Sequence, residues 1–185
     1  MNRTESFYGN NSKMKFFFSL SSLVLVFFQI NAFSFSAPSE SGKFIGKALD
    51  FQCFTGETTK VLSEKYPQFE IYGVDSERKF VDIACKKYPS FHFGLVKRDK
   101  TWSEIFNTKF NVIQVSDYEN FLETFHTMYD LLEEKKGLLY FYYHENDKDR
   151  IEYWLNNFQE ENGPFYFHPH IIHHDKKNNF FILLK

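Results

Sequence analysis

Apolar residues recur along this chain with two alternating spacings, which predict strands and helices in turn from about residue 43 to the end. Short apolar runs predict strands at residues 48–51, 70–74, 91–96, 110–115 and 138–143. Helical spacing predicts helices at residues 58–66, 78–88 and 120–136, a helical turn at 102–106, and a last helix running to about residue 159. This alternation predicts a doubly wound α/β sheet with helices on both faces.

Proline, glycine and acidic residues mark where the helices are expected to begin and end. Pro67 and Pro89 end the first two, because proline cannot continue a helix and restricts the residue before it. Gly137 is expected to cap the helix at 120–136, and Asp147 or Asp149 to begin the last one.

The last part of the chain has a different pattern. Two extended runs, residues 165–174 and 180–184, flank the polar stretch 176–179. A polar turn between two strands predicts an antiparallel hairpin.

Each predicted helix has an apolar side that is expected to face the sheet. The residues on these sides are Val61, Leu62, Phe80, Val81, Ile83, Ala84, Phe121, Leu122, Phe125, Met128, Tyr129, Leu131, Leu132, Ile151, Trp154, Leu155 and Phe158. Two cysteines do not form a disulfide framework, so Cys53 and Cys85 are expected to be small buried residues with no redox or zinc role.

The N-terminal part resembles a targeting segment. Lys13 and Lys15 precede an apolar run at residues 16–30, which is the order of a secretory signal peptide, with cleavage expected after Ala32. The alternative is a signal anchor that stays in the membrane, although the run is shorter than the ~20 residues that a span prefers. Translation could start at Met1 or at Met14.

Residues 31–38 resemble the bipartite plastid presequences of algae with complex plastids, in which a signal peptide is cut just before a phenylalanine and a serine-rich segment follows. We therefore expect entry into the secretory pathway and a plastid destination. Residues 1–42 are assigned to the presequence and its linker, and residues 43–185 to one domain.

The stretch 47–76 organises the domain. It predicts a strand, a tight turn containing Thr55 and Gly56, a helix, and a second strand that ends at Asp75. A strand, a turn and a helix, with an acid about 20 residues after the turn, are the plan of a nucleotide-binding βαβ unit.

This stretch resembles a known family. Residues 49–58 look like motif I of the class I S-adenosylmethionine-dependent methyltransferases, and residues 72–76 look like the acidic motif that follows it. Gln52 and Phe54 stand at the first two glycine positions of motif I, and Gly56 at the third. The resemblance implies a single Rossmann-like α/β domain with a seven-stranded, mostly parallel sheet whose last strand inserts antiparallel between the fifth and sixth.

The resemblance also implies S-adenosylmethionine as cofactor and a set of residues that bind it. Asp75 would accept hydrogen bonds from the ribose hydroxyls, and its alternative role is to cap the next helix together with Ser76. Thr55 and Gly56 would turn the chain into a helix whose N-terminus faces the methionine carboxylate, unless Gly56 is an ordinary turn glycine.

Three further positions belong to the same expected binding set. Asp50 would hold the turn and the amino group of the donor, while Gln52 brings a side chain to the turn. Ser116 follows the fourth strand, where the family places substrate and methionine contacts. Asp99 has a looser correspondence to an adenine-binding acid and is better explained as a solvated charge.

Other polar groups give weaker indications. A net charge of −2 does not indicate nucleic acid as a partner. His168, His170 and His174 would share one face of a strand, but residues six apart on a strand lie about 20 Å apart, so no metal site is expected.

Two functional classes follow. The first is a methyltransferase acting on a small molecule or a protein, and its catalytic residues are not predicted. The second is a methyltransferase-like interaction or structural protein that has lost donor binding. A nicotinamide-dependent oxidoreductase fits less well, because the spaced-glycine fingerprint is absent. The sequence has no insertion long enough to form a lid over the substrate. An active enzyme would therefore need a dimer, a partner protein or a substrate that covers the site itself. Contact with a membrane is expected only through an uncleaved leader.

Overall fold

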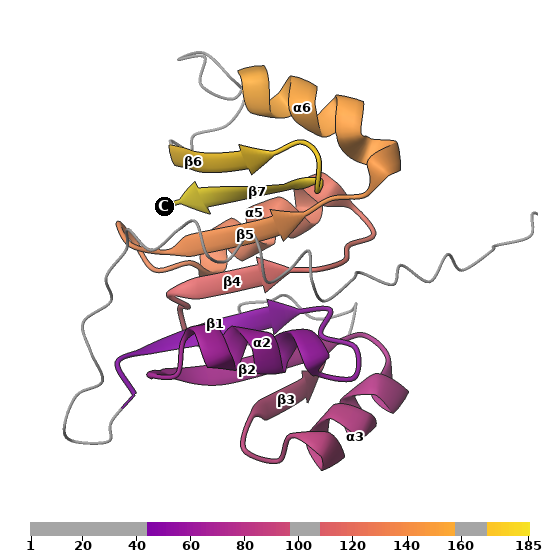
Figure 1. Ribbon diagram of the computed structural model, residues 1–185, viewed down its shortest axis with the longest axis vertical. Coiled ribbons are helices and arrows are strands. Elements are labelled where there is room, and N and C mark those ends of the chain that lie inside the picture. Colours follow the sequence, from indigo (N-terminus) through magenta and orange to yellow (C-terminus); the bar gives the residue numbers. More distant parts are fainter. Residues whose placement is uncertain (1–43, 97–107, 158–169) are drawn as a thin grey trace, which may run out of the picture. The chain divides into compact units, whose positions relative to one another are not determined.

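The computed structural model describes residues 44–96, 108–157 and 170–185 (Figure 1). The expectations for the presequence, the turn at 102–106, Asp99, Phe158 and the first part of the hairpin lie outside these ranges. None of the helices in the described part is long and apolar enough to cross a membrane.

Strands and helices alternate as the sequence predicts. Their bounds are β1 Gly46–Phe51, α2 Glu57–Lys65, β2 Phe69–Asp75, α3 Arg78–Lys87, β3 His92–Leu95, β4 Val112–Val115, α5 Phe121–Leu131, β5 Leu138–Tyr142, η1 Glu145–Asp147, α6 Lys148–Asn157, β6 His170–Asp175 and β7 Phe180–Leu184.

The strands form one seven-stranded sheet in the order β3-β2-β1-β4-β5-β7-β6. The first five strands pair in parallel, and β7 pairs antiparallel with both β5 and β6. The predicted fold, including the last strand inserted between the fifth and sixth, is therefore confirmed.

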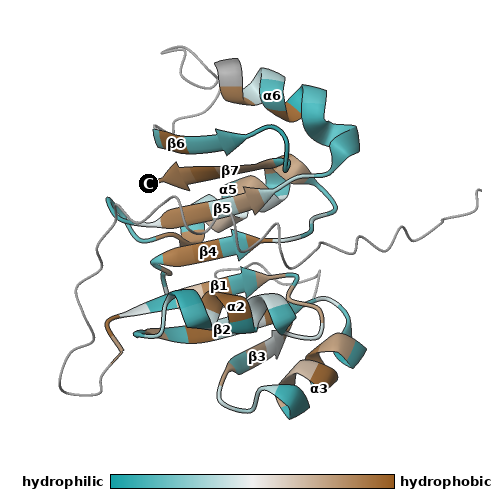
Figure 2. Cartoon of the chain, in the orientation of Figure 1, coloured by the Kyte–Doolittle hydropathy of each residue, from teal (hydrophilic) through white to brown (hydrophobic). Residues whose placement is uncertain are grey.

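The main core lies between the sheet and the helices α5 and α6. Alternate residues of the central strands face these helices, and in Figure 2 the strands β4, β5 and β7 are largely hydrophobic. Aromatic rings dominate the packing: Phe141 stacks on Phe181 at 5.4 Å, and Phe125 meets Trp154 edge-on at 4.7 Å. Ile151 and Leu155 are buried as expected.

The helix α5 is shorter than predicted, because a tertiary contact ends it. It stops at Leu131, and the next residue, Leu132, adopts an extended conformation and bridges to Phe110. The N–H group of Glu133 then donates to the carbonyl of Phe110 at 2.9 Å. The prediction that Gly137 caps this helix was wrong.

The helix α3 buries a narrower stripe than predicted. Val81 and Ala84 are buried, whereas Ile83 and Cys85 are exposed, so the expected burial of both was wrong. The helix covers β2 and the four-residue edge strand β3, and this edge of the sheet offers little surface to a helix. Cys53 is buried as expected.

A β-bulge in β6 makes the expectation that His170 and His174 share one face wrong. The register shifts between Ile171 and His173, so His170 pairs with Leu184 while His174 pairs with Phe181. His170 and His174 therefore lie on opposite faces, because one inserted residue reverses the alternation that follows it.

Candidate functional site

The carboxyl ends of β1, β2, β4 and β5 meet at one edge of the sheet, since these strands are parallel and in register. The strand order reverses between β1 and β4: the chain moves outward to β2 and β3, then returns to the other side of β1. Parallel α/β sheets bind ligands in the crevice outside such a switch point. The candidate site is therefore formed by the segments that follow these strands.

The turn after β1 has an unusual backbone. Gln52, Phe54 and Gly56 all have positive φ values, of 60°, 49° and 88°. Glycine adopts this region freely, whereas another residue held there costs about 1–3 kcal/mol. The turn thus has, at three alternate positions, backbone conformations that glycine adopts freely, although only Gly56 is a glycine.

Hydrogen bonds hold this turn in place. The N–H group of Cys53 donates to the carbonyl of Val74 at 2.9 Å, and that of Gly56 donates to the carbonyl of Cys53 at 2.9 Å. The ring of Phe54 is 41% exposed and packs edge-on against Phe80 of α3 at 5.5 Å. The Phe54 side chain therefore leans toward α3.

Asp75, at the end of β2, is nearly fully buried. Its Oδ2 accepts the N–H group of Phe54 at 2.9 Å, and its Oδ1 accepts that of Glu77 at 2.8 Å. Burial raises the pKa of this carboxyl group, the two N–H donors oppose that rise, and the charges of Glu77 and Asp117 add to it. Asp75 therefore joins the β1 turn to the segment that enters α3.

Asp50 lies fully buried under the turn on β1. Its Oδ2 accepts the hydroxyls of Thr58 and Thr59, each at 2.7 Å, and its Oδ1 accepts Nε2 of Gln114 at 3.3 Å. Burial raises its pKa to about 6, against the opposing effect of these donors. This acid ties β1, the first turn of α2 and β4 together.

We expect the Asp50→Asn variant to lose less stability than the parent protein as the pH rises from 3.8 to about 6. The folded protein keeps the Asp50 proton to higher pH than the unfolded chain does. The contribution of this group to the free energy of unfolding therefore decreases as the pH rises across this interval, by roughly 3 kcal/mol at most. Urea unfolding at several pH values measures the difference. Parallel pH profiles for the two proteins would contradict it.

The remaining predicted residues lie at the same edge with weaker contacts. The hydroxyl of Thr55 bonds to Glu57, and Ser116 is half-buried with its Oγ 3.4 Å from Nε2 of Gln114. Ser76 follows Asp75 directly and is also half-buried. Gly56 immediately precedes α2, and a side chain there would meet the ring of Tyr88.

Gln114 is a residue of this site that sequence reasoning missed. It is buried, and its Oε1 has no hydrogen-bond partner among the described residues. A buried acceptor of this kind favours a ligand or water that donates a hydrogen bond. The available signal was a polar residue, one of two together with Asn111, within the otherwise apolar run at 110–115.

A second polar group lies after β4 and β5 and was also missed in part. Nε2 of His144 lies 2.9 Å from Oδ1 of Asp117. Tyr118 donates its hydroxyl to Oδ2 of Asp147 at 2.9 Å and accepts the N–H group of His144 at 3.2 Å. We refer to Asp117, Tyr118, His144 and Asp147 as the β4–β5 cluster.

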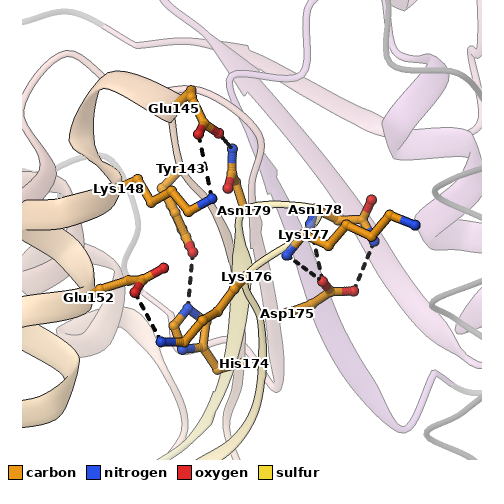
Figure 3. Close-up of polar contacts among 10 residues, drawn as sticks. All are labelled: Tyr143, Glu145, Lys148, Glu152, His174, Asp175, Lys176, Lys177, Asn178 and Asn179. Carbon is orange, nitrogen blue, oxygen red and sulfur yellow. Dashed lines mark hydrogen bonds and ion pairs between the residues drawn. The ribbon is translucent and has the colours of Figure 1, made fainter.

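Beyond this cluster, polar contacts fasten the hairpin turn to α6 (Figure 3). Asp175 accepts the N–H groups of Lys177 and Asn178, which closes the turn between β6 and β7. Lys176 pairs with Glu152 of α6 at 2.9 Å, and Tyr143 bonds to His174 at 3.0 Å. These contacts have a structural explanation, because they hold two edge elements together.

No family model matches the sequence, and no curated protein matches it. Solved structures that resemble the fold include several methyltransferases. A TehB-like S-adenosylmethionine-dependent methyltransferase from Corynebacterium glutamicum aligns with a TM-score of 0.48 and 15% identity, over 76% of this chain and 80% of that one. The plantazolicin methyltransferase BpumL, in complex with SAH, aligns with a TM-score of 0.45 and 19% identity, over 63% and 45%.

The amino pentose methyltransferase CalS10 from Micromonospora echinaspora, with SAM bound, aligns with a TM-score of 0.43 and 14% identity, over 54% and 44%. This chain thus spans less than half the length of BpumL and CalS10. Likeness at this level concerns the arrangement of the chain and transfers no residue role. The fold assignment rests on the strand order itself.

The β1 turn and Asp75 have features that suit a nucleoside sulfonium donor. The backbone has the conformations that spaced glycines supply, and the Phe54 ring leans toward α3. Each oxygen of Asp75 accepts one N–H group and keeps a second lone pair. The described residues therefore suit the donor in the backbone conformation of the turn and in the remaining acceptor capacity of Asp75. In the same ranges, no group of three or more histidine, cysteine or acidic side chains could hold a metal ion.

Proposed function

We propose that this protein is a methyltransferase that uses S-adenosylmethionine and acts on a small-molecule or protein acceptor. The observation that carries the proposal is a glycine-type turn and a buried acid placed together beside the switch point of the sheet. The complete strand order, with β7 between β5 and β6, supports it.

The residues of the site would bind and orient the donor, which supplies a methyl group already activated on a sulfonium. Asp75 would accept the ribose hydroxyls with its remaining lone pairs. The first N–H groups of α2 would face the methionine carboxylate. Orientation of this kind can supply several kcal/mol of the barrier to transfer, about 7–11 in favourable cases.

Calorimetric titration of the protein with S-adenosylmethionine and with S-adenosylhomocysteine tests this proposal. Saturable heat with either ligand, accompanied by a thermal shift, is the expected result. Absence of both heat and thermal shift at millimolar ligand would refute donor binding, and with it the enzyme.

A second candidate is a methyltransferase-like module that no longer binds the donor. Gln52 and Phe54 favour it, because they place side chains where glycines let the backbone pass close to a ligand. The engagement of both Asp75 oxygens by main-chain N–H groups favours it as well.

The Phe54→Gly variant separates the two candidates. For the methyltransferase, we expect it to bind the donor about tenfold more tightly, since loss of the side chain lets the donor come closer to the turn and about 1.4 kcal/mol of relieved crowding corresponds to that factor. The same calorimetric titration measures the change. Phe44→Ala is the matched control, because Phe44 is 58% exposed and precedes β1. Unchanged or weaker donor binding by the Phe54→Gly variant would contradict the prediction.

A further inference from the structure

The β4–β5 cluster has the parts of a proton-transfer site. Asp117 follows β4 and His144 follows β5, so the parallel pairing of these strands brings the two residues together. Nε2 of His144 lies 2.9 Å from Oδ1 of Asp117, and that oxygen also accepts the N–H group of Tyr118 at 2.8 Å. The carboxylate is thus fixed by the main chain and in turn orients the imidazole.

Two more contacts hold His144 in place. The rings of Tyr118 and His144 lie 4.7 Å apart, and the hydroxyl of Tyr118 accepts the main-chain N–H group of His144. Tyr118 is itself buried and donates to Asp147 of η1. The side chains of His144 and Asp117 remain 36% and 42% exposed, so an acceptor molecule can reach them.

The pair lies at the same edge of the sheet as the donor-binding residues. Asp75 ends β2 and Asp117 follows β4, two strands that end at this edge, and the charge of Asp117 raises the pKa of Asp75. Ser116 connects the buried part of the site to Asp117 along the chain. A nucleophile beside His144 would therefore be near the crevice at the switch point.

We propose that His144, oriented by Asp117, is the general base that removes the proton from a hydroxyl-bearing acceptor. This inference rests on the proposed methyltransferase function. With Nε2 held by Asp117, the other ring nitrogen, Nδ1, accepts the proton. A hydrogen bond from one ring nitrogen to a carboxylate fixes an imidazole in one tautomer, and the other nitrogen is then free to act as the base.

The acceptor oxygen bonds to the methyl carbon while the carbon–sulfur bond breaks and its electron pair stays on sulfur. The hydroxyl proton passes to Nδ1 of His144 and then to water. Asp117 stays ionised and stabilises the imidazolium that forms.

A hydroxyl acceptor is the class that needs such a base. A hydroxyl has its pKa far above neutrality and attacks well only as its proton leaves, whereas a thiol is partly ionised already and an amine can release its proton to water beforehand. Asp117 raises the pKa of His144 most, and the main chain of Tyr118 and the charge of Asp147 raise it further. Transfer should therefore slow as the pH falls through that raised value.

The test uses the full chain, S-adenosylmethionine and three probe acceptors: catechol, benzylamine and benzyl mercaptan. Mass spectrometry detects methyl transfer, NMR titration of the histidine ring signals reports the pKa of His144, and calorimetry reports donor binding. The variants are His144→Gln and Asp117→Asn. His92→Gln is the matched control, because His92 also contacts a carboxylate, that of Glu70 at 3.1 Å, but begins β3 at the opposite edge of the sheet.

We expect catechol to be methylated, with a rate about 100-fold lower in His144→Gln, about tenfold lower in Asp117→Asn, and unchanged in His92→Gln. Donor affinity should stay the same in all of them. The acid limb of the pH–rate profile should follow the NMR pKa of His144, and both should shift down in Asp117→Asn, which a merely structural role would not produce.

Four outcomes would overturn the inference. If the donor binds but catechol is not methylated, or if the His144→Gln rate is unchanged, the base assignment fails and the proposed function stands. If only benzylamine or benzyl mercaptan is methylated, the hydroxyl class is wrong. If the donor does not bind at all, the proposed function fails and this inference fails with it.

Discussion

Replacement of Phe125 by alanine is expected to lower the free energy of unfolding by about 3–5 kcal/mol. Phe125 is fully buried on α5, and its ring contacts those of Phe121, Tyr129, Phe141 and Trp154. Alanine would leave a cavity between the helices and the sheet that these rigid rings cannot fill. Domains are stable by only about 5–15 kcal/mol, so the loss is a large share of the total.

Chemical denaturation followed by tryptophan fluorescence and circular dichroism measures this change. The Phe44→Ala variant provides the control, since it makes the same substitution at a 58% exposed position and should change stability by about 0.5 kcal/mol or less. Equal losses in the two variants would show that the core does not lie between α5 and the sheet.

The Asp75→Asn variant is expected to bind S-adenosylmethionine about 100-fold more weakly, since two hydrogen bonds to a charged group contribute about 1.5–3 kcal/mol each and the amide supplies one acceptor oxygen in place of two. The substitution also places an NH₂ group against one of the N–H donors of Phe54 and Glu77. The β1 turn should therefore loosen at the same time.

Calorimetry gives the donor affinity, and thermal unfolding shows how much of the loss comes from the turn. Asp82→Asn is the matched control, because Asp82 is an exposed aspartate on α3. Unaltered donor affinity in Asp75→Asn would remove Asp75 from the binding site and favour the module without donor binding.

Local pattern was enough to predict most elements of this fold. The strand at 70–74 became β2 and the helix at 78–88 became α3, because apolar spacing and the stop at Pro89 act within a few residues. The end of α5 was missed, since the bridge from Leu132 to Phe110 joins residues far apart in the sequence. The bulge in β6 was missed for a similar reason, because it depends on pairing with β7.

The residues of the candidate site likewise fall into those that the sequence predicted and those that it did not. Gly56 and Asp75 were found from their spacing within one βαβ unit and Asp50 from the resemblance to motif I, and the structure places all three around the β1 turn. Gln114 and His144 were not found, because their partners belong to other segments: Gln114 meets Asp50 across 64 residues of sequence. A sequence pattern indicates contacts between residues close together in the chain and does not indicate contacts between distant segments.

By itself, the sequence determined the alternation of elements, the terminal hairpin and the position of the β1 turn, since each depends on residues close together in the chain. Only the tertiary structure decided that Gln52 and Phe54 keep glycine-type conformations, because hydrogen bonds from Cys53 and Phe54 to Val74 and Asp75 of the next strand hold the turn in that shape. It alone also decided that Asp117 and His144 meet, since their contact exists only where parallel β4 and β5 end at the same edge.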